Sequence, residues 1–158
     1  MLIRGKAGMM LRANKDTPYD IFEKLAELEK TCIPDGWSAK GFKAEAEKDN
    51  GIVLYTLEYN GDISSFLTAY TAIGEADITN VVVNPEYRRK GLAQSLISEL
   101  EKIIPKDSED IFLEVRESNS PALNLYLKSG FEQIAIRKNF YSNPVENAVI
   151  MKKKAGMI

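Results

Sequence analysis

The sequence predicts an α/β (α+β) fold in which a mixed, mostly antiparallel sheet of about seven strands is flanked by about four helices. The first observation is size, because 158 residues with 44% apolar side chains suit one domain, residues 1–158, with a substantial buried core. The second is an antiparallel meander over residues 52–83, where β-branched and apolar runs are separated by turn signals. The third is the second half of the chain, where strand patterns alternate with helix patterns.

Two helix patterns precede the meander, after a short first strand predicted at residues 2–4. Thr17 suits an N-cap and Pro18 the first helical position, which together predict the start of the first helix. The Ile-Pro-Asp-Gly run at 33–36 ends it, and a second helix is predicted over 38–48.

The meander consists of three predicted strands, at residues 52–59, 63–73 and 76–83. Asn60-Gly61 is a strong hairpin signal between the first two strands. Gly74-Glu75 then turns the chain into the third strand.

Two strand-to-helix units follow the meander. The β-branched run Val81–Val83 leads through a turn and a basic loop into an amphipathic helix over 92–104. Residues 110–116 predict a strand that alternates between two faces, with Ile111, Leu113 and Val115 on one and Phe112, Glu114 and Arg116 on the other.

The last helix is predicted from its ends. Ser120 suits the cap, Pro121 the first helical position, and Gly130 the left-handed residue at the stop. Two final strands are predicted at 131–137 and 148–152, with a loop between them.

The basic loop before the helix at 92–104 is a candidate anion site. The first turn of a helix has N–H groups without helical partners, and the positive end of the dipole lies there. Gly91 lets the backbone approach a ligand closely, and Arg88, Arg89 and Lys90 add positive charge. From these residues alone, a phosphate pocket and an ordinary connection with solvated charges both stay open. Neither the Walker pattern nor G-x-G-x-x-G is present.

Composition narrows the classes of function. The 21 Lys and Arg against 23 Asp and Glu give a net charge of −2, which does not suggest a nucleic-acid partner. The densest basic run, Lys152–Lys154, is expected to be a solvated end. The sequence contains no histidine, so His-dependent triads, zinc sites and acid–base chemistry are excluded, and no metal site is predicted.

The single cysteine, Cys32, permits no internal disulfide and indicates a reducing compartment. We expect it to be a small buried apolar residue rather than a nucleophile. No apolar run approaches the roughly 20 residues that span a bilayer, and a secretory signal pattern is absent. A cytoplasmic protein without a membrane partner is therefore expected.

Two motifs together resemble one family. The first is Arg88-x-x-Gly91-x-Ala93, preceded by V-x-N-P-x-Y, and the second is the segment Leu113–Phe131. Both are similar to the GCN5-related N-acetyltransferases (GNAT), and specifically to the RimI-type subfamily that acetylates the N-terminal amine of a ribosomal protein. The resemblance is close over residues 80–151 and weaker before that, where an I-P-D-G-W-S loop fits the same subfamily.

The resemblance implies acetyl-CoA as co-substrate and a set of residues that bind it. In the family the first strand of the motif pairs its backbone with the pantetheine amides and offers an N–H to the thioester oxygen. The diphosphate rests on the backbone of the basic loop, and an Asn side chain bonds the pantetheine arm. By this resemblance the cofactor-binding residues are Val81, Val82, Val83, Arg88, Arg89, Lys90, Gly91, Leu92, Ala93, Gln94 and Asn119. From the sequence alone, Asn119 is equally a turn or cap residue.

The resemblance also implies two catalytic residues. Glu114 would act as the base that deprotonates the attacking amine, often through water; the alternative is a solvated strand carboxylate. Tyr126 would protonate the departing thiolate, a transfer that is only modestly uphill from a phenol pKa of about 10 to a thiol pKa of about 8.5. The alternative for Tyr126 is an aromatic residue of the core, because it shares helical spacing with apolar neighbours.

Acceptor contacts are implied for Trp37, Arg137 and Tyr141. Arg137-x-Asn139-Phe140-Tyr141 resembles the R-R-N-Y-Y run that lines the peptide channel of RimI-type enzymes, with Lys138 and Phe140 as departures. Trp37 would close the opposite wall, or else is a buried loop anchor. The leading hypothesis is therefore acetyl transfer to a protein N-terminus, by a monomer or homodimer. Lysine side chains, small-molecule amines and a non-catalytic acyl-CoA sensor are the alternatives.

Overall fold

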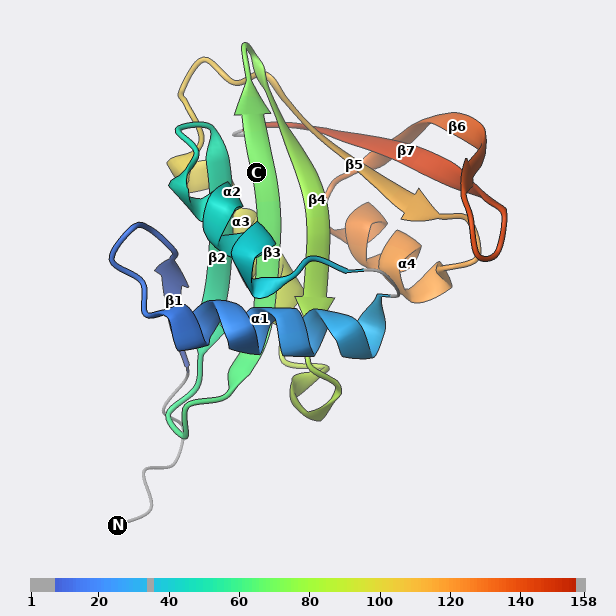
Figure 1. Ribbon diagram of the computed structural model, residues 1–158. Coiled ribbons are helices and arrows are strands. Elements are labelled where there is room, and N and C mark those ends of the chain that lie inside the picture. The colour runs from blue at the N-terminus through green and yellow to red at the C-terminus, as the bar shows by residue number, and fades with distance from the viewer. Residues whose placement is uncertain (1–7, 34–35, 156–158) are drawn as a thin grey trace. The chain divides into compact units, whose positions relative to one another are not determined.

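The computed structural model describes residues 8–33 and 36–155. Within this part the elements follow the order β1 (Met9–Arg12), α1 (Tyr19–Cys32), α2 (Ala39–Glu47), β2 (Gly51–Leu57), β3 (Ile63–Ala72), β4 (Glu75–Val83), the 3-10 turn η1 (Pro85–Tyr87), α3 (Leu92–Ile103), β5 (Asp110–Arg116), α4 (Ser120–Lys128), β6 (Glu132–Tyr141) and β7 (Glu146–Lys154) (Figure 1). None of these helices is both long and apolar enough to cross a membrane.

The strands form one sheet in the order β1-β2-β3-β4-β5-β7-β6. The pairs β1–β2, β5–β7 and β6–β7 are antiparallel, and β4–β5 is parallel. The predicted fold class, a mixed sheet of seven strands with four helices, is confirmed.

The parallel register of β4 and β5 is short. It runs from Glu75 opposite Asp110 to Ile78 opposite Leu113, whereas β4 itself continues to Val83. The backbone of Val81–Val83 thus lies beyond the paired segment. Its other neighbour is β3, where the N–H of Asn84 donates to Ser64 O at 2.8 Å.

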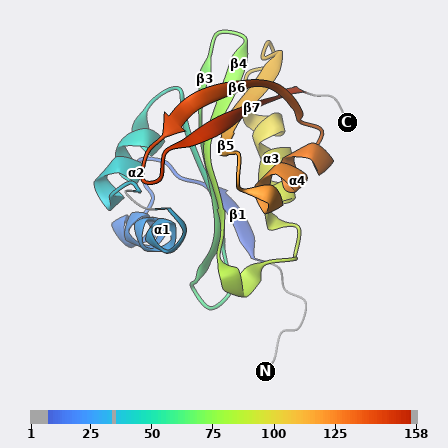
Figure 2. The ribbon, with the colours of Figure 1, turned by 90° about the vertical axis from the view of Figure 1, so that its right-hand side faces the viewer.

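The chain divides into two compact units, so the expectation of one domain stays a prediction. The first unit comprises the described residues up to Ala69 together with Asn80–Leu96. In it α1 and α2 lie on the same face of β2 (Figures 1 and 2). Their apolar stripes bury Ile21, Phe22, Leu25, Leu28 and Phe42 against Val53, Tyr55, Phe66 and Val82.

The second unit comprises Tyr70–Thr79 and the described residues from Ile97 onward. Its buried side chains come mainly from α3, β5, α4 and β7, whereas β6 contributes none. They include Leu100, Ile111, Leu113, Val115, Tyr126, Phe131, Val149 and Met151. Burial along β5 alternates as its sequence predicts, because strand side chains point to opposite faces in turn.

The C-terminal lysines are part of the second unit, and the expectation of a solvated end is wrong for Lys152 and Lys153. They belong to β7, which stays paired with β5 as far as Lys154 opposite Asp110. Lys153 Nζ lies 2.7 Å from Glu101 Oε1, and both side chains are more than four-fifths buried. Because β7 stays paired with β5, these two lysines belong to the sheet and do not form a free, solvated tail.

Several helix ends differ from the prediction. Pro18 rather than Thr17 occupies the N-cap of α1, and the Thr17 hydroxyl instead accepts from the N–H of Asn14 at 2.9 Å. Asn119 rather than Ser120 caps α4, with its Oδ1 accepting from the Ala122 N–H at 3.2 Å. Both shifts are one residue. At α4, Asn and Ser are both preferred cap residues, so either of the two neighbours can cap the helix. At α1, Pro18 holds the N-cap position without a side-chain cap bond.

Three further expectations have mixed outcomes. The strand predicted at residues 2–4 lies outside the described residues. Cys32 is exposed, not buried, because it is the last residue of α1 on the solvent side. The penultimate strand extends to Tyr141, so the run from Arg137 lies within β6, where a register irregularity and a left-handed Asn139 (φ 53°) mark its distortion.

Candidate active site

The turn between β4 and α3 is built to present backbone N–H groups. Asn84 Oδ1 accepts from the Glu86 N–H at 3.1 Å, which starts the single turn of η1. Arg89 and Gly91 then adopt left-handed conformations, with φ of 66° and 73°. The first helical bond of α3 runs from the Ser95 N–H to Gly91 O at 3.0 Å. The N–H groups of the helix's first turn are therefore available to a ligand.

The space beside Gly91 is open, because a Cβ added there would meet no atom within 4 Å. Arg88, Arg89 and Lys90 are exposed, and none of them forms an ion pair with another described residue. Lys90 Nζ lies 5.2 Å from the centre of the Tyr87 ring. Open space, free N–H groups and unpaired cations together fit a diphosphate. Val82 points into the core, as expected of a residue that offers a ligand only its backbone.

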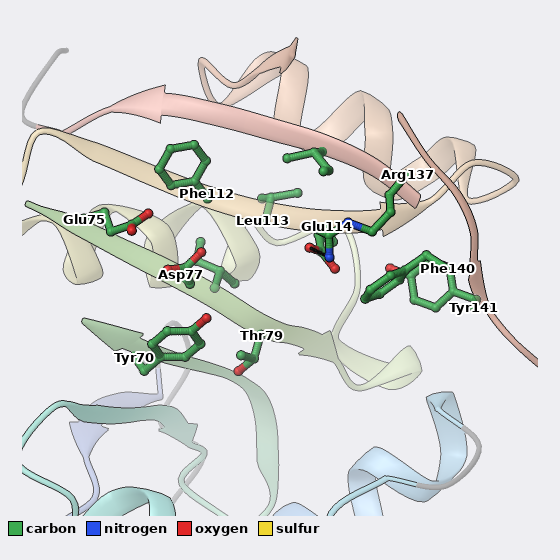
Figure 3. Close-up of a pocket in the computed structure, with 12 residues that line it drawn as sticks. Tyr70, Glu75, Asp77, Thr79, Phe112, Leu113, Glu114, Arg137, Phe140 and Tyr141 are labelled. Atoms are coloured by element: carbon green, nitrogen blue, oxygen red, sulfur yellow. Dashed lines mark ion pairs between the residues drawn. The ribbon is translucent and has the colours of Figure 1, made fainter. Parts of the chain in front are cut away.

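The second unit contains a pocket of about 370 Å³. Its lining includes the predicted residues Glu114, Arg137 and Tyr141, together with Tyr70, Glu75, Asp77, Thr79, Phe112 and Phe140 (Figure 3). Glu114 Oε1 lies 3.3 Å from Arg137 Nη1, and the Glu114 side chain is one-third exposed. Glu114 is thus a strand carboxylate that opens into a cavity, not one that faces bulk solvent.

Charge in this pocket is predominantly negative. Glu75, Asp77 and Glu114 contribute three carboxylates against the one guanidinium of Arg137. Burial raises the pKa of Asp77, and the neighbouring Glu75 and Glu114 raise it further. Such a cavity favours a cationic ligand, for example an ammonium group. Sequence reasoning missed both residues: it assigned Glu75 to the turn before the strand predicted at 76–83, and Asp77 to that strand without a role.

Tyr126 lies in α4 with its ring packed edge-to-face on Phe131, 5.8 Å between centres. Its hydroxyl has no hydrogen-bond partner among the described residues. Burial, with a smaller contribution from Tyr141, raises the pKa of Tyr126 to about 12. Burial also raises the pKa of Tyr141, followed by the effect of Glu114. Tyr126 therefore combines the two expected features, a core ring and a hydroxyl that is free to donate.

The remaining predicted residues are placed as follows. The Asn119 side chain caps α4 through Oδ1, which leaves its Nδ2 group as the donor for a ligand. Trp37 is half-buried in the first unit, with its ring edge-to-face on Phe42 at 5.3 Å. Tyr141 has the Arg116 guanidinium 4.4 Å above its ring. Among the described residues, no group of three or more acidic, Cys or His side chains is arranged to hold a metal ion.

The comparisons with known proteins all identify acetyltransferases as similar to this chain. The model of the acetyltransferase (GNAT) family matches residues 22–131. The ribosomal protein bS18-alanine N-acetyltransferase of Haemophilus influenzae is 36% identical over 134 residues, covering 82% of this chain and 90% of that protein. The enzyme of the same name from Escherichia coli K12 is 32% identical over 118 residues, 73% of this chain and 78% of that one. An N-alpha-acetyltransferase of Sulfurisphaera tokodaii is 31% identical over 143 residues, 82% of this chain and 84% of that protein.

Solved structures agree with the sequence comparisons. The crystal structure of the bS18-alanine N-acetyltransferase from Escherichia coli superimposes with a TM-score of 0.77 at 28% identity. The match covers 95% of this chain and 96% of that one.

Proposed function

The chain belongs to the acetyltransferase (GNAT) family, and from that premise we propose that it acetylates the N-terminal α-amine of a protein. Ribosomal protein bS18 is the first candidate acceptor, because the relatives are named for acetylation of a bS18 alanine, which we take to be its N-terminal residue. The enzyme is an N-acetyltransferase whose acyl donor is acetyl-CoA. We place it in the cytoplasm, where such an acceptor is synthesised.

The observation that carries the proposal is Glu114 in its acidic pocket. Only a neutral amine attacks a thioester, so an ammonium must first be bound and then lose a proton. Glu75, Asp77 and Glu114 supply the negative charge that attracts the ammonium, and Glu114, directly or through a water, takes the proton. Arg137 forms an ion pair with Glu114 in this structure, and the arriving ammonium replaces Arg137 as the partner of Glu114.

The pKa of the acceptor favours an α-amine over lysine. At pH 7 about one in ten α-amines is neutral, against fewer than about one in a thousand lysine side chains. A single carboxylate with a modest proton-accepting task therefore suffices for an N-terminus.

Acetyl-CoA supplies the acetyl group as a thioester, and the residues of this chain do the rest. The N–H groups from Lys90 to Gln94 and the cations of the same loop hold the diphosphate. The backbone of Val81–Val83, beyond the β5 register, pairs with the pantetheine amides. Asn119 donates Nδ2 to the arm, and the unbonded Tyr126 hydroxyl donates to the departing sulfur.

The test compares acceptor peptides by mass spectrometry. Three peptides are supplied with acetyl-CoA: one with the bS18 N-terminal sequence, the same peptide with a blocked N-terminus, and a lysine-rich peptide with a blocked N-terminus. A gain of one acetyl group on the free N-terminus alone supports the proposal. Mass detection is preferred to a thiol reagent because Cys32 is exposed and would react with it.

Two results would contradict the proposal. Acetylation of lysine in the blocked peptides would move the acceptor to side chains. Binding of acetyl-CoA without turnover on any peptide would support a sensor module. Trp37, Arg137 and Tyr141 are proposed as acceptor contacts, and exchange of the bS18 peptide for a scrambled one tests whether those contacts select sequence.

A further inference from the structure

One buried acidic residue has no part in the mechanism above. Glu29, in the last turn of α1, is the one charged side chain among the described residues that is buried from solvent, with 0% of its surface exposed. No lysine or arginine of the described residues pairs with it. Burial raises its pKa, and a backbone hydrogen bond opposes that effect.

Both oxygens of Glu29 accept hydrogen bonds from separate segments. Oε2 accepts from the backbone N–H of Trp37 at 2.6 Å, in the connection between α1 and α2. Oε1 accepts from Asn80 Nδ2 at 2.5 Å, on β4. All three residues belong to the first unit, and Figure 1 shows α1, the connection into α2 and the C-terminal end of β4 next to one another.

The connection is also shaped around this carboxylate. A Cβ at Gly36 would lie 2.7 Å from Glu29 Cγ and 2.8 Å from Oε2. Glycine is therefore needed at position 36 so that the backbone can pass over the carboxylate.

Stability alone does not account for a carboxylate here. A buried carboxylate without a cation loses its hydration, and a leucine of similar size would fill the site without that loss. What leucine cannot do is hold an N–H of the α1–α2 connection and an amide of β4 at the same time. The two groups it would release lie beside residues with proposed roles, since Trp37 is an acceptor contact and Asn80 directly precedes Val81–Val83.

We propose that Glu29 is a positioning residue whose carboxylate fixes the acceptor wall at Trp37 to the cofactor strand at Asn80. The inference rests on the proposed function, because that function gives Trp37 and Val81–Val83 their roles. Through this link the loop that meets the acceptor and the backbone that meets the pantetheine amides keep one relative position within the first unit. Loss of the link therefore weakens the binding of both acceptor and acetyl-CoA, although Glu29 contacts neither of them.

The first test uses two variants of Glu29 and a matched control. Glu29→Leu removes both acceptors, and its KM values for acceptor peptide and acetyl-CoA should each rise about tenfold. Glu29→Gln keeps an oxygen for Trp37, and its new amide group can donate to Asn80 once that side chain turns its oxygen inward. It should therefore stay within about threefold of the wild type. Glu27→Gln, on the exposed face of the same helix, makes the same charge change and should leave all constants unaltered.

A second pair of variants, Asn80→Asp alone and together with Glu29→Gln, tests the hydrogen bond between Glu29 and Asn80. Asn80→Asp places two carboxylates face to face, and its affinity for CoA, measured by titration calorimetry, should fall at pH 8 and partly return near pH 6, where the pair shares a proton. Glu29→Gln with Asn80→Asp restores one donor and one acceptor and should recover the affinity at both pH values. Melting temperatures measured at the same two pH values separate this change in affinity from a change in folding, and a purely structural role would make the two change together.

The outcomes are distinguishable. If Glu29→Leu is folded and has the constants of Glu27→Gln, the inference is wrong. If Glu29→Leu does not fold, the Asn80→Asp series decides, and failure of the double variant to recover overturns the inference. If the wild type binds CoA but acetylates no peptide, the proposed function fails, while the CoA affinities of the same series still report on the link to Asn80.

Discussion

Replacing Tyr126 by Phe removes one hydroxyl and little else. The ring contact with Phe131 remains, and the hydroxyl has no hydrogen bond with the described residues that could be lost. We therefore expect the melting temperature of Tyr126→Phe to stay within about 2 °C of the wild type near neutral pH. Any loss of rate then reports on the reaction and not on folding.

The size of the kinetic effect follows from the raised pKa of Tyr126. With a pKa of about 12, proton transfer from Tyr126 to a thiolate is uphill by about 5 kcal/mol, against about 2 kcal/mol for an ordinary phenol. Donation of a hydrogen bond to the developing thiolate then matters more than complete transfer. We expect kcat to fall about 100-fold, the low end for general acid catalysis, with unchanged affinity for CoA.

The same pKa predicts a pH dependence of stability. The folded-state pKa of Tyr126 is about 12 and the unfolded value about 10, so the stability contribution is complete below pH 10 and is lost as the pH rises toward 12. The loss amounts to about 3 kcal/mol at most. Denaturant unfolding of the wild type and Tyr126→Phe between pH 9 and 12 should show the difference between them changing by this amount.

The control for both experiments is Tyr19→Phe, since Tyr19 is exposed and also keeps its ring contact, with Phe22, in the variant. A Tyr126→Phe enzyme with kcat within twofold of the wild type would refute the donor role. A drop in kcat accompanied by a melting temperature many degrees lower would assign Tyr126 to packing alone.

Three further predictions concern the pocket and the loop. Glu114→Gln should lower kcat at least 100-fold with little change in CoA affinity, measured by steady-state kinetics and calorimetry, and equal rates would remove its role as base. Asp77→Asn should raise the KM for a peptide acceptor several-fold, and an unchanged KM would contradict a cationic acceptor. The melting temperature should stay equal or rise, because burial and two neighbouring carboxylates destabilise the charged form of Asp77. Gly91→Ala should weaken CoA binding about tenfold, because alanine is strained at a φ of 73° although space is available there. Calorimetry measures the affinity. The matched control is Gly74→Ala, which is also at positive φ but lies in the β3–β4 turn.

The sequence was sufficient wherever the signal is local. Alternation along residues 110–116 places Glu114 opposite the buried Leu113, and Gly91 lies at the left-handed position that the turn into α3 requires. The cap of α4 was predicted one residue too late, because Asn119 and Ser120 are adjacent and both are preferred cap residues.

Long-range pairing is what the sequence did not contain. Asp77 reaches the pocket of Glu114 because β4 pairs with β5 in parallel, and Arg137 reaches it because β7 lies between β5 and β6. Neither register follows from period-two patterns. Glu29 was missed although a local signal was present. It follows Leu25 by four residues, and this spacing places its carboxylate on the apolar face of α1, among core residues.

The most direct test of the account is a crystal structure of the protein with CoA and a peptide that carries the bS18 N-terminus. We expect diphosphate oxygens within hydrogen-bond distance of the N–H groups of Lys90 to Gln94, and the peptide amine in the pocket at Glu114. A diphosphate bound elsewhere, or a peptide whose amine lies outside that pocket, would contradict the account.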